Sequence, residues 1–528
     1  MVLSRSNTNP LSNANTGVVN NEATWNQFVA FTNNGVVSNK AGVFVCPQVF
    51  TNNKTVENLT GARFIVDFGG SFTNATGSTL TNAGNFQNLS TFINNTTVTN
   101  TGTVSNNGVH TCNGIFNNES GGRIESTATV NLSGIWNNKS GATTQSGFRF
   151  NVLANGVVNN GGTFQNNDQI DIKTGGSFTN QANAVLNSAF GSAILNAGIF
   201  RNTATSKIVS NGELNNANLF INNGLFESID GSKIINSDSL INNSTIKNVN
   251  VLTNSGYFEN NSTIENMSGA VWTNTGRFLN TVPGVVINGF EIFNRTGGFF
   301  TNNGTIKNNI RLFNEGLNFV NNGYLAATGD VLNRTGAKIL NTEVLEIFEG
   351  SLVNEGAFEN SKTVIVRKCG ILSNKGAITN SGSIRSEGIV FQRGTLTGNA
   401  VVKITGLVLT STSSEVATGL CKPTFRSGTD VGGRAKVDAA QVLLPTIGLD
   451  SCGGFQYFIN GLNRSTYGCA EIGTTIPGRL KIVLRTGDSL TCNTSIEVFD
   501  GVAPLIANCP QDVTIFSLND TASYVWLA

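Results

Sequence analysis

Apolar and polar positions alternate along most of the chain in a short motif, an apolar residue followed two places later by asparagine. The stretch 253–280, TNSGYFENNSTIENMSGAVWTNTGRFLN, contains the motif at Phe258, Ile264, Trp272 and Phe278. In a β-strand the apolar residue and the asparagine point to the same side, and the residue between them points to the other. A helix does not fit, because apolar residues six or eight apart share no helical face and Asn, Gly, Thr and Ser are poor helix formers. Each motif is therefore predicted to be a short strand.

The spacing of these asparagines sets a longer period. From Asn254 to Asn314 the successive spacings are 6, 6, 8, 6, 8, 6, 8, 6 and 6, so that any three in a row add up to 20 or 22. The same period of 20 residues separates Asn202, Asn222 and Asn242. Three strands separated by corners then make one turn of about 20 residues. We predict an all-β fold whose main part is a triangular, three-sided β-solenoid.

Stacking such coils at the strand spacing of about 4.8 Å places like residues above like. Apolar residues such as Phe72, Phe86, Phe92 and Phe116 are then expected to form columns in the core. The asparagines are expected to form ladders of side-chain amides, since a buried amide without partners is costly. Gly and Asn suit the corners because both tolerate left-handed backbone angles. The handedness of the solenoid does not follow from the pattern.

The asparagine rhythm divides the chain into four segments. We expect an N-terminal segment or cap over residues 1–23 and the solenoid over residues 24–399, with roughly 19 coils and a length of roughly 90 Å at the strand spacing. Residues 400–502 contain short β-like runs with Gly, Asp and Ser turns, which favour an antiparallel β-sandwich. Residues 503–528 are expected to begin a further module.

The composition excludes some functions. Among 528 residues only 12% are charged and the net charge is +1, which argues against nucleic acid as a partner because phosphate binding requires a basic surface. No apolar run approaches the roughly 18 to 20 residues that cross a bilayer, so no membrane span is expected. The N-terminus lacks the layout of a signal peptide, which predicts either removed export information or an internal piece of a longer chain.

Cysteine usage points to an oxidising environment. Five of the eight cysteines lie in the last quarter of the chain, no CxxC pair occurs, and the lone His110 cannot complete a zinc site. We therefore expect no metal and no cofactor, and instead disulfides among Cys421, Cys452, Cys469 and Cys492, with the pairing left open. Disulfides favour an extracellular or cell-surface location.

Candidate catalytic groups are sparse, although other β-solenoids degrade polysaccharides. The best acidic clusters are Asp168 and Asp171 with Lys173, and the run Glu343, Glu346 and Glu349. Glu346 alternates with Leu345 and Ile347, which indicates a solvated outward face. We predict that the chain is not an enzyme and has no catalytic residues.

Two smaller features are interpreted in the same way. His110 stands two places before Cys112, but no third group to orient a nucleophile pair is evident, so a packed or surface histidine is expected. Thr97, Thr99, Thr101 and Thr103 suggest an ice-binding face, but the pattern does not recur in every coil.

The C-terminal residues 502–528, VAPLIANCPQDVTIFSLNDTASYVWLA, resemble the opening of a hyalin-repeat (HYR) domain, an immunoglobulin-like adhesion module. The matching residues are Pro504, Ile506, Cys509, Pro510, Asp512, Val513, Thr514, Ile515 and Trp526. The match is confined to this short terminal stretch, and the later cysteine that would pair with Cys509 in that family is absent. Asn-rich coils followed by such a module are similar to large secreted surface proteins of Bacteroidetes-type bacteria, commonly adhesins or filament components.

These observations predict an extracellular structural or adhesive protein, a rigid solenoid rod of a cell surface or filament. The resemblance implies cell-surface or glycan partners, and open solenoid ends are unpaired strand edges that favour end-to-end or lateral assembly of the chain with itself. The alternative is a carbohydrate-binding or polysaccharide-degrading β-helix protein.

Overall fold

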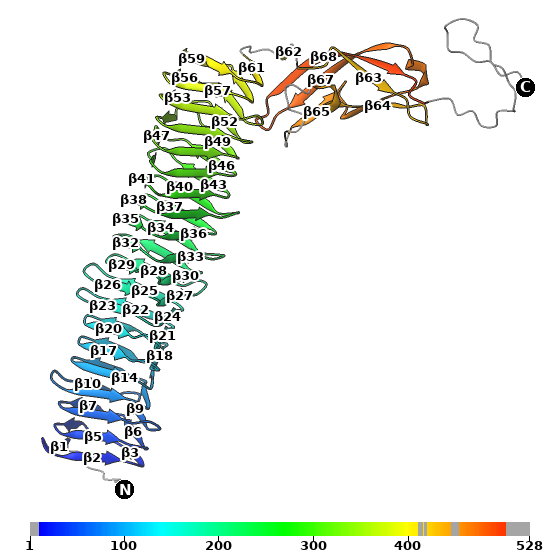
Figure 1. The fold of residues 1–528 in the computed structure, drawn as a ribbon. Helices are drawn as coiled ribbons and strands as arrows, with labels where there is room; N and C mark the ends of the chain where they lie inside the picture. Colours follow the sequence, from blue (N-terminus) through cyan, green and yellow to red (C-terminus); the bar gives the residue numbers. More distant parts are fainter. Residues whose placement is uncertain (1–9, 410–414, 417–419, 445–451, 453–454, 503–528) are drawn as a thin grey trace, which may run out of the picture. The chain divides into compact units, whose positions relative to one another are not determined.

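The computed structural model describes residues 10–409, 415–416, 420–444, 452 and 455–502. The chain divides into two compact units, one up to Ser411 and one from Thr412. The first unit is built from three long parallel sheets, which follow one another around each coil and contain every third strand (Figure 1). The predicted all-β, three-sided solenoid is confirmed.

One coil of the stretch 253–280 illustrates the geometry. Strands β37 (Val251–Asn254), β38 (Tyr257–Asn260) and β39 (Thr263–Asn266) belong to what we call sheets 1, 2 and 3. The chain then returns to sheet 1 as β40 (Val271–Asn274), whose Trp272 pairs in register with Leu252. The repeat period of the sequence is therefore one turn of the solenoid.

Within nearly every four-residue strand the second and fourth residues are buried and the first and third face outward. In β38, for example, Phe258 and Asn260 are buried, while Tyr257 and Glu259 lie on the outside. This alternation is the direct consequence of the two-residue repeat of a pleated strand. It places one apolar and one amide side chain from each strand in the core.

Two kinds of corner explain the spacings of six and eight. Asn88 and the next strand, β13 (Thr91–Asn94), are separated by two residues, whereas Asn74 and β11 (Thr79–Asn82) are separated by four. The four-residue corner contains Gly77 at φ +84°, a left-handed angle that suits glycine. In two-residue corners the backbones approach so closely that a Cβ on Gly102 would lie 2.1 Å from the carbonyl oxygen of Gly84.

The coils extend beyond both ends of the predicted range 24–399. The first described coil contains β1 (Leu11–Asn13), β2 (Val18–Asn21) and β3 (Thr24–Asn26), so residues 11–23 are part of the repeat rather than a separate segment. The last strands are β58 (Ile389–Gln392), β59 (Thr395–Gly398), β60 (Val401–Lys403) and β61 (Leu407–Leu409). Only β60 and β61 lie beyond residue 399, and no asparagine marks them, since Lys403 pairs with Ser386 and Leu409 with Phe391.

The second unit is a smaller β structure. Strands β65 (Gln456–Ile459), β67 (Thr475–Val483) and β68 (Ser489–Phe499) pair in antiparallel fashion, as do β64 (Ala435–Asp438) and β66 (Arg464–Tyr467). Strands β62 (Glu415–Val416) and β63 (Thr424–Gly428) instead run parallel to β68, which departs from the expected all-antiparallel arrangement. Two short 3₁₀ turns, Ala439–Val442 and Cys469–Glu471, complete the described part.

A disulfide joins Cys421 and Cys492 in this unit, so the prediction of disulfides among the C-terminal cysteines is confirmed. Cys452 is also disulfide-bonded, whereas Cys469 is an exposed free thiol. The HYR-like segment, including Cys509, lies outside the described residues.

Candidate functional site

The most regular chemical feature of the molecule is a ladder of asparagine side chains inside sheet 2. Nineteen successive strands of this sheet end in a buried asparagine, from Asn21 to Asn380. Each Nδ2 donates to the Oδ1 of the asparagine in the next coil at 2.7–2.9 Å, which gives eighteen consecutive bonds, all in the same direction. The predicted amide ladder is therefore present, and on this sheet it is unbroken.

The ladder amides also bind the backbone at the corners. Asn260 Nδ2 donates to Asn280 Oδ1 at 2.7 Å and to the carbonyl oxygen of Ser262 at 2.9 Å, while its Oδ1 accepts from Asn242 Nδ2 at 2.7 Å. Asn260 thus holds its own corner and both neighbouring coils. Burial without such partners would cost a few kcal/mol per amide, so the ladder requires coils in register.

The equivalent positions in sheets 1 and 3 are less uniform. In sheet 1 the ladder stops where Cys112, Leu132, Val152 and Ile172 replace asparagine, and resumes at Asn196. Asn94 Nδ2 contacts Cys112 Sγ at 3.7 Å at this break. Sheet 3 mixes asparagine with serine and aliphatic residues such as Val66 and Ile347. The aliphatic replacements exchange amide bonds for apolar burial, which needs no polar partner.

Aromatic rings fill much of the remaining core. Phe44 and Phe64 stack in successive coils with centroids 4.8 Å apart, and Phe64 meets Phe72 of the neighbouring sheet edge to face at 5.3 Å. Both geometries are favourable for aromatic pairs. The columns predicted from the coil spacing are therefore packed core, and Phe72, Phe86, Phe92 and Phe116 all lie within it.

His110 takes a phenylalanine position in this core. Its ring stacks on Phe92 at 4.4 Å and lies 5.7 Å from Trp136, and it is 1% exposed. Burial lowers the pKa of His110 to about 3, so the imidazole is neutral at ordinary pH. The histidine is packed, in agreement with the sequence interpretation, and burial raises the pKa of the neighbouring Cys112 thiol to about 12.

The clearest acidic cluster spans four coils on the outside of sheet 3 and its following corner. Tyr324 Oη donates to Glu346 Oε2 at 2.6 Å, and Arg367 Nε donates to Glu346 Oε1 at 2.5 Å. Arg367 also donates to Glu387 Oε1 at 3.3 Å. Burial and the hydrogen bond to Glu346 raise the pKa of Tyr324 to about 12, and the same carboxylate raises the pKa of Arg367. The cluster pairs one guanidinium with two carboxylates and ties adjacent coils together.

The environment of Glu346 differs from the solvated face predicted for it. It faces outward, as its alternation with Leu345 predicts, but it is only 7% exposed rather than solvated. Tyr324 and Arg367 cover it, and each lies in an adjacent coil. A similar arrangement lies on sheet 2, where Tyr257 donates to Glu259 at 2.5 Å and burial raises the pKa of Tyr257 to about 12.

The other candidate residues are not brought together. Asp171 pairs with Lys173 at 2.5 Å on sheet 1, while Asp168 lies in the preceding corner. Glu343 pairs with Lys362. The four threonines do not share a face: Thr97 and Thr99 lie on β14 (Thr97–Asn100) of sheet 2, Thr101 lies in a corner, and Thr103 lies on β15 (Thr103–Asn106) of sheet 3.

Within the described residues no group of three or more His, Cys, Asp or Glu side chains is placed to hold a metal ion. In the same part of the chain no helix is long and apolar enough to span a bilayer.

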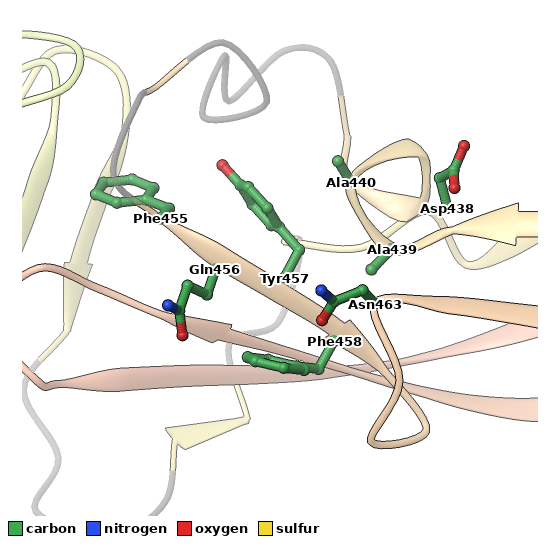
Figure 2. Close-up of a pocket in the computed structure, with 8 residues that line it drawn as sticks. All are labelled: Asp438, Ala439, Ala440, Phe455, Gln456, Tyr457, Phe458 and Asn463. Carbon is green, nitrogen blue, oxygen red and sulfur yellow. The ribbon is translucent and has the colours of Figure 1, made fainter.

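The second unit has a hollow of about 410 Å³ that no sequence motif indicated. Its lining combines three rings with polar groups, and Figure 2 shows Tyr457 pointing away from Gln456 and Phe458 of the same strand. The lining residues are Asp438, Ala439, Ala440, Phe455, Gln456, Tyr457, Phe458 and Asn463. Arg464 pairs with Asp438 at its rim, and the guanidinium of Arg485 lies 5.7 Å from the ring of Phe455. Such a mixture of rings and amides is typical of small-molecule sites.

The coils, ladders and core stacks define the first unit as a parallel β-solenoid repeat structure. No protein-family model matches the chain, and no curated protein matches it either. The geometry of the solenoid and of the second unit is therefore the basis for assigning a function.

Proposed function

We propose that the chain is a non-catalytic extracellular structural or adhesive protein in which the solenoid acts as a stiff rod of a cell surface or filament. The observation that carries this proposal is the unbroken amide ladder of sheet 2. A chain of buried hydrogen bonds in one direction favours stiffness because bending must lengthen bonds that water cannot replace.

The cost of opening a coil supports the same role. Each coil contacts only its two neighbours, so stability accumulates along the solenoid. Opening one internal coil exposes apolar side chains such as Phe258 and Ile264 and breaks backbone bonds on both sides. Such a structure resists proteases, which need a locally unfolded segment. Resistance of this kind suits a protein outside the cell.

The proposed location rests on three observations. The Cys421–Cys492 disulfide is compatible with an oxidising compartment. The low proportion of charged residues and the Asn-rich coils resemble secreted surface proteins of Bacteroidetes type. The HYR-like residues from Pro504 to Trp526 suggest an adhesion module after the second unit.

The absence of catalysis is part of the proposal. On the outside of the solenoid, Glu346 and Glu259 are each held by a tyrosine in addition to other donors. A general acid or base needs a free proton position facing a substrate, and these carboxylates direct their oxygens to the protein's own donors. The bonds of Glu346 tie adjacent coils together and those of Glu259 fix its own strand and corner, which favours a structural role for both over chemistry.

Two measurements test the proposal. Small-angle scattering on the purified chain should give a longest dimension of at least about 90 Å, the length of about twenty coils at the strand spacing. Limited proteolysis should leave fragments covering the solenoid. A globular scattering profile, or rapid cleavage within the coils, would overturn the structural role. Release of oligosaccharides from a polysaccharide panel would overturn the non-catalytic assignment.

Glycan binding is the second candidate function, and the hollow of the second unit favours it. The ring of Tyr457 offers a face to the C–H groups of a sugar, and the amide of Asn463 suits its hydroxyl groups. Glycan-array binding by the intact chain that is lost in Tyr457→Ala supports this function. Binding that survives the substitution, or no binding at all, removes the hollow as the site.

A further inference from the structure

Exposed large apolar side chains gather on one of the three edges of the solenoid. This edge, which we call the 3–1 edge, is made by the corners that lead from each strand of sheet 3 to the next strand of sheet 1. Four phenylalanines stand on it: Phe28, Phe68, Phe148 and Phe190, with exposed fractions of 64%, 76%, 44% and 76%. They are the most exposed rings of the described solenoid apart from Phe299.

Aliphatic residues continue the same edge. Ile229, Met267, Ile310 and Ile404 are each between 37% and 46% exposed and also lie in corners from sheet 3 to sheet 1. Among the described coils the other two edges hold far fewer such residues. Leu317 lies on the edge between sheets 1 and 2, and Leu59 and Val282 lie on the edge between sheets 2 and 3. Chance alone would spread corner residues evenly over three edges.

The ring of Phe190 is held against the edge rather than left loose. Phe190 leans along the edge so that its Cε2 lies 3.0 Å from where a Cβ on Gly231 would be, two coils further on. Gly231 has φ +88°, so glycine is favoured there for its backbone as well as for the space it leaves to the ring. A fixed ring loses little entropy on binding, which favours a contact surface.

The charge of the edge narrows the class of partner. Between residues 27 and 310 its corners contain Asp67, Asp168 and Asp230 and no lysine or arginine. An anionic lipid surface or a nucleic acid requires basic groups, so neither fits this edge. The partner should itself present apolar groups with little charge.

The apolar area of the 3–1 edge and its alternation of large and small corners suit contact with a second copy of the chain. The eight residues together expose on the order of 800 Å² of largely apolar surface, close to what each partner buries in an ordinary stable interface. Small corners, such as Asn107–Gly108 and Asn211–Gly212, lie between the corners that carry rings, so knobs and notches alternate. Two identical edges can therefore interlock, as a two-fold interface requires.

We propose that two copies of this chain associate side by side along the 3–1 edge. This pairing deepens the proposed structural role and rests on it, because lateral association is how single rods become a thicker fibre. The predicted contact centres on Phe68 and Phe190, the two most exposed rings.

Sedimentation velocity of the full chain over a range of concentrations tests the pairing. The unmodified chain should form a dimer, and the double variant Phe68→Ser/Phe190→Ser should raise the dissociation constant at least 100-fold, because buried aromatic anchors dominate interface energies. The matched control is Val282→Ser/Leu317→Ser, which removes side chains of similar exposure (74% and 64%) from the other two edges and should leave the dimer unchanged. Circular dichroism and the thermal midpoint should be the same in all three proteins.

Three results would overturn the pairing: a monomer at every concentration, equal weakening by the control variant, or a dimer that survives loss of both rings. Co-sedimentation of monomer with phosphatidylcholine vesicles that depends on Phe68 and Phe190 would assign the edge to a lipid surface instead. A monomer that still scatters as a long rod removes the pairing alone and leaves the proposed structural role standing.

Discussion

Replacing one ladder asparagine by alanine tests the central physical claim about the solenoid. Asn260 is fully buried in the middle of sheet 2, between Asn242 and Asn280. The change Asn260→Ala removes its amide and leaves the backbone of β38 unaltered. We expect a large local loss of stability, because the amide bonds two neighbouring coils as well as its own corner.

The structure allows the size of this loss to be worked out. Four bonds disappear: the one from Asn242 Nδ2 and those to Asn280 Oδ1, to the carbonyl oxygen of Ser262 and, at 3.3 Å, to the carbonyl oxygen of Val285. Asn242 Nδ2 keeps the carbonyl oxygens of Ser244 and Thr263 at 2.9 and 3.0 Å, but the buried Asn280 Oδ1 loses its donor from the preceding coil. At about 1 kcal/mol for each of the bonds to Asn242, Ser262 and Val285, and about 1–3 kcal/mol for the unpaired Asn280 acceptor, the total is about 4–6 kcal/mol.

Hydrogen exchange read by mass spectrometry is the suitable assay, since a repeat structure need not unfold in one step. Peptides covering residues 236–288 should exchange about three to four orders of magnitude faster, because each loss of about 1.4 kcal/mol raises the open population tenfold. The matched control is Asn261→Ala, which removes the adjacent, half-buried amide. That amide donates to Asn243 of the neighbouring coil and to Glu259, both at 2.8 Å, and accepts from Thr281 at 2.6 Å. Its former partners can bind water at the surface instead, so the control should change stability by less than about 1 kcal/mol.

Equal effects of Asn260→Ala and Asn261→Ala would refute the reasoning, since the deeper burial of Asn260 is what distinguishes the two amides. An effect of Asn260→Ala below about 1 kcal/mol would also refute it, because the loss of four bonds would then cost no more than the loss of one.

Three other parts of the molecule allow further tests. Because burial lowers the pKa of His110 to about 3, the unfolded chain takes up a proton first as pH falls below about 6.5, and at pH 4 the coil should lose about 3 kcal/mol relative to pH 7. His110→Phe should abolish that part of the acid sensitivity in exchange measurements at the two pH values, and an unchanged acid response would contradict it. Cys421→Ser opens the link to Cys492 across 71 residues and should destabilise the second unit by about 4 kcal/mol, seen as faster exchange in residues 475–499 with the coils unaffected. Gly134→Ala would place a Cβ 1.9 Å from the carbonyl oxygen of Gly114 and should lower the thermal midpoint, at a cost of about 3 kcal/mol; an unchanged midpoint would show that this corner can shift.

The coil could be predicted from the sequence because the alternation of side chains along a strand determines which residues are buried, and the repeat period determines which of them stack. A strand alternates its side chains, and the repeat period puts Trp272 above Leu252 and Asn280 above Asn260 without any knowledge of distant contacts. Even the two corner lengths are visible as spacings of six and eight. Where the asparagine motif is lost, as in β60 and β61, the predicted C-terminal boundary of the solenoid falls too early.

Other features depend on neighbours that the local pattern does not contain. The burial of Glu346 comes from Tyr324 and Arg367 in adjacent coils, which only the register reveals. The concentration of Phe68 and Phe190 on one edge becomes visible only after each corner is assigned to a side of the triangle. The sequence of the second unit does not repeat, so its hollow could not be predicted from a period. The hollow is lined by residues between 438 and 463 that no motif marks.

The amide ladder of sheet 2 has a consequence for how the length of such a protein changes. Every level of the ladder presents the same donor to one side and the same acceptor to the other, so any two levels can be joined. Removing or inserting one whole coil therefore restores equivalent contacts and alters the rod by a single strand spacing, about 4.8 Å. Gene duplication or deletion in units of about 20 codons can change the length of the rod without redesigning the core. Length in this architecture is a quantity that evolution, or an engineer, can adjust in steps.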